Sequence, residues 1–306
     1  MQEEFKKFNI KTNYDTSKVS WLKSGGIAKY FCNIKNVIQL TELFKFLNKN
    51  KIPFLTIGNF SNTLIKSSGF DGLLLKLSGE FSNININLNR ETVTVGSSVL
   101  DLKFSMFCYE NSICDYEYLY TIPGTIGGNI FMNAGCYGFE IKDQIHKIKI
   151  FDTLTLKIQE LSADEINFSY RKGFQEKNKI ILSVELIAKL GSRDNIKRRM
   201  KELDQKRNET QPRRANCCGS IFKNPRSLKK TDDFDNKLSA WKLIQSSVDD
   251  SFYSGEVKLS KKHSNFFENE PYIDPDKLEL FLKNIEEKVM LKHNIKLEKE
   301  LRIIGV

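Results

Sequence analysis

Residues 121–138 read TIPGTIGGNIFMNAGCYG, and they place five glycines among small, uncharged side chains. Glycine has no Cβ, so it lets backbone N–H groups approach a ligand closely and adopts a positive φ at little cost. A run such as Gly124–Gly128 can therefore curl into a nest of amides that binds an anion, and Pro123 fixes the entry to the turn. Because no basic side chain interrupts the run, we expect main-chain amides and the Thr125 hydroxyl to hold a pyrophosphate. A tight structural turn between two strands is the alternative.

Other glycine-rich nucleotide motifs do not fit this stretch. It does not follow the dinucleotide pattern G-x-G-x-x-G, and the pattern G-x-x-x-x-G-K-[ST] occurs nowhere in the chain. We therefore expect neither a Rossmann site nor a P-loop site.

The length and the charge of the chain limit the remaining possibilities. At 306 residues it can form two or three domains of about 100 to 150 residues. Its formal net charge of +10 suits nucleic acid, an acidic surface or a small anionic molecule. The charges are spread along the sequence, without a zinc finger, an RNA-binding aromatic motif or a basic tail. We therefore expect a phosphate-bearing ligand and no nucleic acid.

The cysteines and the N-terminus indicate a cytosolic protein. The six cysteines show no C-x-x-C pair and no zinc-like spacing with histidine, so we expect reduced thiols and no metal. The first ten residues, MQEEFKKFNI, lack an apolar core, and no apolar run reaches about 18 residues. We therefore expect a protein that is not exported and does not span a membrane.

Local patterns predict a mixture of helices and strands. Apolar residues at three- and four-residue steps predict a helix that Asn36 caps and another helix over 276–293. The highly charged segment 193–209 predicts a solvated helix linking two domains, and a polar insert follows at 226–237. Residues 295–304 alternate apolar and charged side chains, which predicts a final strand.

Seven short segments together resemble one known family. They are Gly58–Asn62, Ile122–Gly128 with Met132–Gly135, Ser169–Arg171, Gln211–Pro212, Gly219–Pro225, His263–Phe266 and Leu297–Gly305. Each segment is weak alone, but all occur in the same order as in the FAD-dependent UDP-N-acetylenolpyruvoylglucosamine reductases of bacterial peptidoglycan synthesis, the MurB family. The resemblance covers about residues 20 to 305.

This resemblance implies a fold and a reaction. The fold is α+β: a two-lobed FAD-binding fold of the vanillyl-alcohol-oxidase or PCMH type, with lobes at 1–80 and 81–192, and a C-terminal α/β substrate-binding domain at 193–306. The implied enzyme is monomeric and cytosolic. It reduces UDP-N-acetylglucosamine enolpyruvate to UDP-N-acetylmuramate, using FAD as cofactor and NADPH as hydride donor.

The resemblance also implies roles for individual residues. Ser220 resembles the proton donor, and Arg171 and Glu300 resemble the pair that acts on the substrate carboxylate. From its neighbours alone, Glu300 would be read as an exposed strand residue. The residues that correspond to FAD-binding positions are Gly58, Asn59, Ser61, Asn62, Ile122, Pro123, Gly124, Thr125, Gly127 and Gly128. Those that correspond to substrate-binding positions are Tyr170, Lys223, Asn224 and His263.

Three positions depart from the family pattern. Phe60 stands where a third glycine is common, and Asp250 and Glu256 stand in a stretch that usually carries a basic residue and small residues. An acid near a diphosphate repels it, so either Lys258, Lys261 or Lys262 compensates or substrate binding is weakened. Because the residues that resemble the catalytic set are present, we expect compensation. Two rival functions remain: a flavin oxidoreductase for another substrate, such as an alcohol or a hydroxy acid, and a binding protein without turnover.

Overall fold

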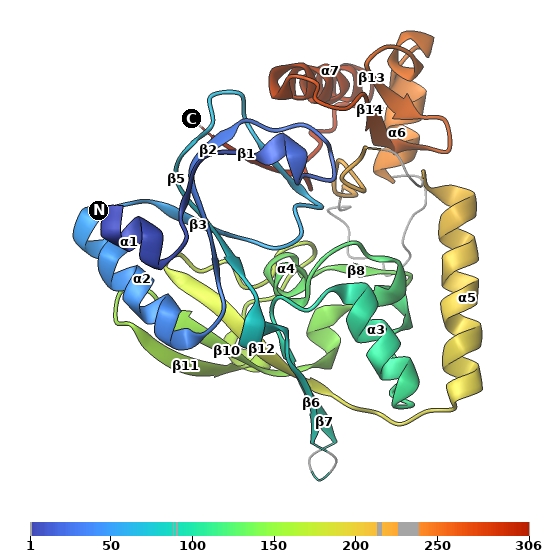
Figure 1. The fold of residues 1–306 in the computed structure, drawn as a ribbon. Helices are drawn as coiled ribbons and strands as arrows, with labels where there is room; N and C mark the ends of the chain where they lie inside the picture. Colours follow the sequence, from blue (N-terminus) through green and yellow to red (C-terminus); the bar gives the residue numbers. More distant parts are fainter. Residues whose placement is uncertain (1, 88, 90, 213–215, 226–238, 306) are drawn as a thin grey trace. The chain divides into compact units, whose positions relative to one another are not determined.

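The computed structural model describes residues 2–87, 89, 91–212, 216–225 and 239–305, and Figure 1 traces them. The polar insert expected at 226–237 lies outside these residues. The helices are α1 (Gln2–Lys7), α2 (Val37–Asn50), α3 (Asp101–Glu110), α4 (Ile126–Met132), α5 (Arg193–Thr210), α6 (Ala240–Ser247) and α7 (Pro275–His293). The strands are β1 (Lys11–Asp15), β2 (Ile27–Ile34), β3 (Phe54–Ile57), β4 (Thr63–Ile65), β5 (Phe70–Leu77), β6 (Ile84–Asn87), β7 (Thr92–Gly96), β8 (Gly135–Cys136), β9 (Phe139–Glu140), β10 (Ile145–Asp152), β11 (Lys157–Ser162), β12 (Lys179–Ile187), β13 (Val257–Ser260), β14 (His263–Asn269) and β15 (Arg302–Ile304).

The chain forms two compact units, and each is made of separate stretches. Unit 1 contains residues 1–12, 29–59 and 71–206, and unit 2 contains residues 13–28, 60–70 and 207–306. The predicted segments 1–80, 81–192 and 193–306 are uninterrupted, whereas these units are not. The two short stretches near the N-terminus therefore have most of their contacts with the C-terminal part of the chain.

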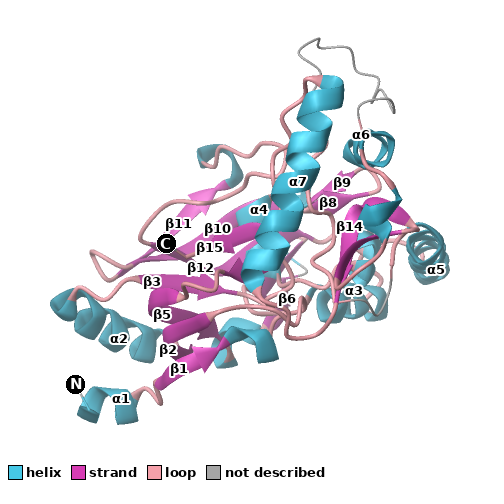
Figure 2. Cartoon of the chain, turned by 90° about the horizontal axis from the view of Figure 1, so that it is seen from above, coloured by secondary structure: helices cyan, strands magenta, loops and turns pink. Residues whose placement is uncertain are grey.

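The first sheet of unit 1 has the strand order β1-β2-β5-β3 (Figure 2). Strands β3 and β5 are parallel, with Phe54 opposite Leu73, and α2 packs four buried apolar side chains into the same core. The Asn36 side chain accepts a hydrogen bond from the Gln39 amide at 2.9 Å, which caps α2 as predicted. The periodicity and the cap in the sequence therefore identified this helix correctly.

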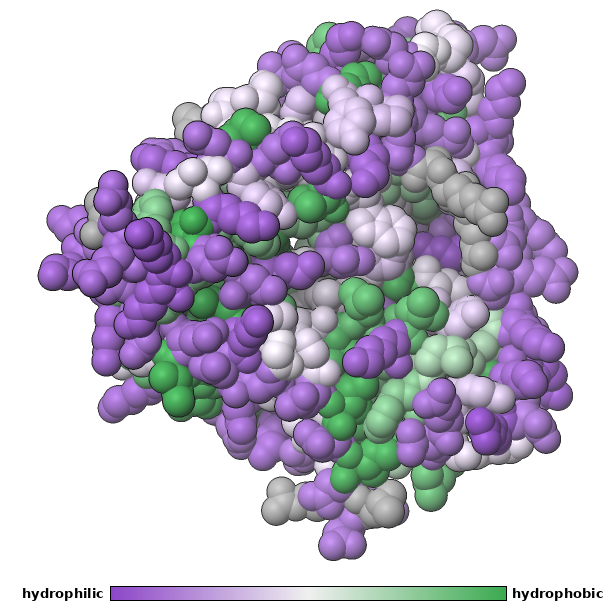
Figure 3. Space-filling model, viewed as in Figure 1, coloured by the Kyte–Doolittle hydropathy of each residue, from purple (hydrophilic) through white to green (hydrophobic). Residues whose placement is uncertain are grey.

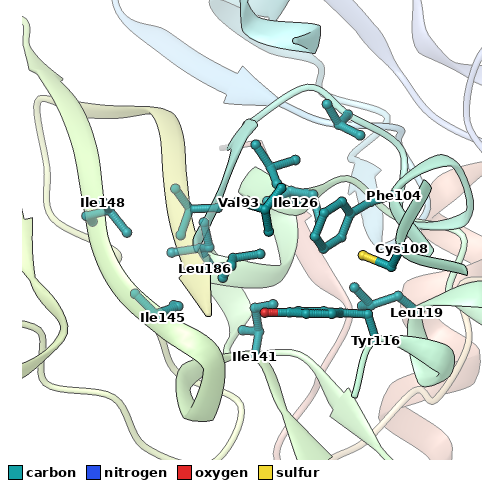
Figure 4. Close-up of a cluster of buried hydrophobic side chains, with 14 of the residues drawn as sticks. Val93, Phe104, Cys108, Tyr116, Leu119, Ile126, Ile141, Ile145, Ile148 and Leu186 are labelled. Atoms are coloured by element: carbon teal, nitrogen blue, oxygen red, sulfur yellow. The ribbon is translucent and has the colours of Figure 1, made fainter. Parts of the chain in front are cut away.

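The second sheet of unit 1 is antiparallel, with the strand order β11-β10-β12-β7-β6. Its apolar side chains share a core cluster with α3 and α4. Figure 4 shows Ile126, from the glycine stretch, in this cluster beside Phe104. The glycine stretch is thus anchored by an apolar side chain at its centre and is not a simple turn between strands.

Unit 2 combines a β-hairpin, a parallel strand pair and two helices. Strands β13 and β14 are antiparallel, and β4 pairs in parallel with β15. Helix α7 buries an apolar stripe that includes Leu278 and Leu282, as its periodicity predicts, and α6 packs beside it. Leu22 and Leu64 belong to the same core cluster, so the stretches from early in the sequence contribute side chains to the core of this unit.

The predicted final strand is only partly correct. Residues 302–304 form β15, but the segment before them forms only an isolated bridge between Lys299 and Phe222. This segment bonds first to 221–223, and only 302–304 then pair with β4, so no continuous strand forms over 295–304. The predicted helix at 193–209 is confirmed as α5, although Ile196, Met200 and Leu203 are buried on one face.

Much of the face seen in Figure 3 is polar. Figure 3 shows hydrophilic residues over much of the viewed face, in keeping with a chain in which 28% of residues are charged. Among the described helices, none is long and apolar enough to span a membrane.

All six cysteines lie in the described part of the chain, and none forms a disulfide. Within that part there is also no cluster of three or more potential metal-ligating side chains.

Candidate active site

Two of the segments expected to bind cofactor lie against each other in unit 1. A Cβ added to Gly58 would stand 2.6 Å from the Thr125 Oγ1 atom, so only glycine permits this approach. The Asn59 Nδ2 group donates a hydrogen bond to the Pro123 carbonyl at 3.2 Å, 64 residues further along the chain. The structure therefore brings together Gly58, Asn59 and the stretch 122–128.

The amides of the glycine stretch are largely bonded within the protein. Ile126 N–H donates to the Val99 carbonyl at 3.0 Å, and Gly127 N–H donates to the Ser97 carbonyl at 2.8 Å. Gly128 N–H donates to Thr125 Oγ1 at 3.3 Å, which caps α4. These three amides are not directed at an anion, so the predicted nest in which successive amides converge on one phosphate is wrong in that form.

A buried acid that sequence reading missed lies behind this stretch. Asp101 is 0% exposed, and its Oδ1 atom accepts a hydrogen bond from Asn129 Nδ2 at 2.7 Å. A Cβ on Gly124 would stand 2.5 Å from Asp101 Oδ2. Burial raises the pKa of Asp101 well above its usual range, although the Gly124 amide and Asn129 oppose the shift. The only signal in the sequence is an acid in the first turn of α3.

Arg171 is positioned by the second half of the glycine stretch. It has a left-handed backbone with φ of +55°, and its Nη2 group donates to the Gly135 carbonyl at 2.8 Å. Its guanidinium lies over the Tyr170 ring, 5.1 Å from the centroid. The buried Asn133 donates through Nδ2 to the Ser169 carbonyl at 3.0 Å. Two family-like segments, 132–135 and 169–171, are thus joined in unit 1.

Ser220 and Glu300 are brought together in unit 2. Glu300 N–H donates to the carbonyl of Ile221, the neighbour of Ser220, at 2.7 Å. Lys223 N–H donates to the Glu298 carbonyl at 2.8 Å, which continues the contact between the two segments. Both Ser220 and Glu300 are partly exposed, so their side chains are accessible. Glu300 is therefore bonded to the residue that directly follows Ser220 in the chain.

Asn265 fixes the other side of the segment that carries Ser220. Ile221 N–H donates to the Asn265 carbonyl at 2.9 Å. The Asn265 side chain accepts from Phe222 N–H at 2.9 Å and donates to the Phe222 carbonyl at 2.8 Å. Asn265 is 3% exposed. The sequence places Asn265 in the motif His263–Phe266 but carries no signal of its positioning role.

The residues expected to bind substrate have defined protein contacts. Lys223 Nζ lies 3.3 Å from Glu298 Oε2, in a contact that leaves the lysine side chain 24% exposed. Asn224 accepts a hydrogen bond from Ala240 N–H at 2.9 Å through Oδ1, at the start of α6. Its side-chain carbonyl therefore satisfies one of the open amides of that helix.

The surroundings of His263 favour its neutral form. Its Nδ1 atom accepts a hydrogen bond from Asn265 N–H at 3.2 Å, and its ring packs edge-on against Phe266, with centroids 4.8 Å apart. Burial lowers the pKa of His263 to about 4. At neutral pH this side chain can therefore contribute a hydrogen bond to a ligand but no positive charge.

The three unusual positions have different surroundings. Phe60 has a left-handed backbone with φ of +51°, and its ring is 6% exposed, so the ring is packed into the protein. Glu256 is exposed and forms an ion pair with Lys277 at 2.5 Å, which is none of the three lysines expected to compensate. Asp250 is exposed at the start of a short 3-10 helix, Asp250–Tyr253.

Comparison with known proteins adds the family context. Residues 28–155 match a model described as "FAD binding domain", and residues 211–304 match "UDP-N-acetylenolpyruvoylglucosamine reductase, C-terminal domain". A UDP-N-acetylenolpyruvoylglucosamine reductase from Pelagibacter ubique (strain HTCC1062) is 37% identical over 312 residues, which cover 99% of each chain. One from Rickettsia rickettsii (strain Sheila Smith) is 35% identical and covers 98% of this chain and 97% of its own.

A solved structure is also similar over nearly the full length. The crystal structure of UDP-N-acetylenolpyruvylglucosamine reductase (MurB) from Thermus caldophilus has a TM-score of 0.77 at 24% identity, and the match covers 97% of this chain and 98% of the other. The predicted α+β fold, with an FAD-binding domain and a distinct C-terminal domain, is therefore confirmed. On the full-length identity to its relatives, the chain belongs to the UDP-N-acetylenolpyruvoylglucosamine reductase family, MurB.

Proposed function

We infer that this chain reduces UDP-N-acetylglucosamine enolpyruvate to UDP-N-acetylmuramate in peptidoglycan precursor synthesis, with FAD as cofactor and NADPH as reductant. Full-length membership of the family supports the reaction. The structural observation that supports it most directly is the hydrogen bond from Glu300 N–H to the Ile221 carbonyl, which keeps Ser220 and Glu300 on adjacent segments. A site that adds a hydride and a proton to a carboxylated alkene needs such groups close together.

Each catalytic residue has a chemical reason for its role. When bound, FAD would supply hydride chemistry, with NADPH as the source of the hydride. The Arg171 guanidinium neutralises the negative charge that grows on the substrate carboxylate, and Glu300, when protonated, can hydrogen-bond the same oxygens. The Ser220 hydroxyl donates a proton to the substrate carbon next to the one that receives the hydride. Serine is a weak acid in water, so this step depends on positioning and on the local field.

The described residues fit an FAD. Gly58 and Asn59 lie against 122–128, and Gly128 is exposed. A Cβ added to Gly128 would meet only Thr125 Oγ1, at 3.4 Å, so the backbone there is open to a ligand. The residues that we propose to hold FAD are Gly58, Asn59, Ser61, Ile122, Pro123, Gly124, Thr125, Gly127 and Gly128. Asn62 was also expected to bind FAD, but its side-chain amide donates to the Glu300 carbonyl instead. Because amides 126–128 are bonded to the protein, contacts to the pyrophosphate come from the other members of this set.

The substrate is an anionic UDP-sugar. Lys223 supplies positive charge for its diphosphate, whereas the neutral His263 supplies a hydrogen bond. Tyr170 and Asn224 complete the proposed set of substrate contacts. The basic net charge of the chain favours encounter with such a ligand. We propose that the enzyme acts as a cytosolic monomer without nucleic acid.

An anaerobic visible spectrum tests this function. Flavin absorption that is bleached by NADPH and restored by the enolpyruvyl UDP-sugar is the expected result. Absorption that stays bleached after the UDP-sugar is added would instead favour a flavin oxidoreductase for another substrate. A protein that binds FAD but is not reduced by NADPH would favour a binding function. A protein that cannot be loaded with FAD would contradict the assignment as a whole.

The Ser220→Ala variant tests the role of the hydroxyl. Flavin reduction by NADPH should remain close to that of the unaltered chain, while reoxidation by the UDP-sugar should slow by orders of magnitude. Ser254→Ala, at an exposed serine in the same unit, is the matched control and should leave both rates unchanged. Equal slowing of the two half-reactions, or of neither, would remove Ser220 from the role of proton donor.

A further inference from the structure

Both backbone groups of Glu300 are fixed by hydrogen bonds. Its N–H donates to the Ile221 carbonyl at 2.7 Å, and its carbonyl accepts from Asn62 Nδ2 at 2.9 Å. Arg302 N–H donates to the Asn62 carbonyl at 3.2 Å. Asn62 therefore bonds the chain on both sides of Leu301, a core residue that is 3% exposed.

The secondary structure that follows keeps this contact in register. Asn62 immediately precedes β4, and β4 pairs in parallel with β15, with Thr63 opposite Arg302. A one-residue slip would move the Asn62 amide away from Glu300 and would also turn the side chains of β15 to the opposite face. The position of Glu300 is thus tied to the loop 58–62, which lies more than 200 positions away in sequence.

The side-chain amide of Asn62 bonds to the Glu300 carbonyl. Its Nδ2 group is the donor to Glu300, and its Oδ1 atom is buried with no hydrogen-bond donor among the described residues. A direct role in binding FAD would leave its Nδ2 group facing the cofactor. Here that group faces a backbone carbonyl, as expected for a residue that orients a peptide group.

We propose that Asn62 is a positioning residue for the Glu300–Ser220 pair, so that the loop expected to bind cofactor also sets the geometry of the protonating side of the site. The path from Asn62 towards Ser220 runs through two hydrogen bonds: the Asn62 side chain donates to the Glu300 carbonyl, and Glu300 N–H donates to the carbonyl of Ile221, the residue after Ser220. This inference rests on the proposed roles of Ser220 and Glu300. A displacement of about 1 Å at such a site can slow the chemistry by about 100-fold.

The half-reactions of the FAD-saturated Asn62→Ala enzyme test this proposal. Reoxidation of the flavin by the UDP-sugar should slow about 10- to 100-fold, and reduction by NADPH should change less than about threefold. Asn59→Ala is the matched variant, because it removes an amide from the same loop that donates to Pro123 and not to Glu300. It should weaken FAD retention and change the rates of the two half-reactions to a similar extent. If Asn62→Ala also changes both rates to a similar extent, the proposal is overturned.

A double-mutant cycle separates this inference from the proposed function. If Asn62 acts through Glu300, adding Asn62→Ala to Glu300→Gln should slow reoxidation much less than Asn62→Ala does alone. Fully additive effects would overturn the role of Asn62. A Glu300→Gln variant with normal reoxidation would instead remove Glu300 from the proposed mechanism. If Asn62→Ala does not fold, Asn62→Leu removes the donor while keeping a side chain of similar shape, and the same outcomes apply.

Discussion

At the scale of single residues, three of the family-like segments contain a non-glycine residue with a left-handed backbone. Phe60, Asn133 and Arg171 have φ of +51°, +46° and +55°. This conformation costs roughly 1 to 2 kcal/mol for a residue with a Cβ. Packing and hydrogen bonds around these residues offset that cost. The sequence indicated that Phe60 was unusual, but it could not indicate that the ring is packed into the protein while the backbone keeps a conformation that glycine favours.

Replacing Phe60 with glycine should destabilise the protein, even though glycine suits the backbone. Relief of the left-handed strain contributes about 1 kcal/mol, whereas loss of a buried aromatic ring costs about 3 to 5 kcal/mol. We expect a net loss of about 2 to 4 kcal/mol in the free energy of unfolding, measured by urea denaturation.

Glu91→Gly is the matched control for this prediction. Glu91 also has a left-handed backbone, with φ of +51°, but its side chain is exposed. Glycine should therefore leave stability unchanged or raise it by up to about 1 kcal/mol. If Phe60→Gly is as stable as Glu91→Gly, the Phe60 ring contributes no packing energy.

Asp101 predicts a pH dependence of stability. Its pKa is raised in the folded protein by burial, while an unfolded aspartate has a pKa of about 3.9. Both states are protonated below about pH 4. As the pH rises above that value, the unfolded chain releases this proton first. Unfolding therefore becomes easier by up to about 1.4 kcal/mol per pH unit until the folded carboxyl also ionises.

The Asp101→Asn variant removes this term and should keep a similar shape. We expect it to become progressively more stable relative to the unaltered chain as the pH rises above about 4, the unfolded pKa, in urea denaturation with excess FAD. Asp164→Asn, at an exposed position, should show no such trend. A constant difference between Asp101→Asn and the unaltered chain would mean that Asp101 is ionised when folded.

At the scale of elements, helices with strong periodicity were predictable and contacts between segments were not. The helices α2, α5 and α7 follow from apolar or charge patterns in their own sequences. Part of the glycine stretch forms α4, because Thr125 caps the helix and Ile126 packs into the core. A glycine pattern typical of phosphate-binding loops indicates neither contact. Residues 298–301 alternate like a strand, yet they bond mainly to 221–223.

The N-cap of α2 is a testable element-scale contribution. Asn36→Ala removes the acceptor for Gln39 N–H and should lower the free energy of unfolding by about 1 kcal/mol. Asn50→Ala changes an exposed amide at the other end of the same helix, so its effect should be within about 0.5 kcal/mol. Equal effects in thermal or urea denaturation would show that the cap adds nothing specific.

At the scale of the whole molecule, the sequence predicted the fold class but not how the two units share the chain. The sequence-based division was into consecutive segments, whereas unit 2 contains residues 13–28 and 60–70 as well as 207–306. The parallel pairing of β4 with β15 joins residues more than 200 positions apart. Short apolar strands carry no local signal for such a distant partner, so only the three-dimensional structure reveals it.

This arrangement predicts that residues 207–306 do not fold alone. Without the earlier stretches, β15 lacks its partner β4, and the core lacks the fully buried side chains of Leu22 and Leu64. Loss of one buried leucine side chain costs about 2 to 5 kcal/mol, and loss of both approaches the whole stability of a typical domain. The fragment should retain some helix in far-UV circular dichroism but show no cooperative thermal transition. Amides of α7 that exchange slowly in the full chain should exchange rapidly in the fragment. A cooperative transition with protected α7 amides would mean that 207–306 is an autonomous domain. Residues 13–28 and 60–70 would then not be needed for it to fold.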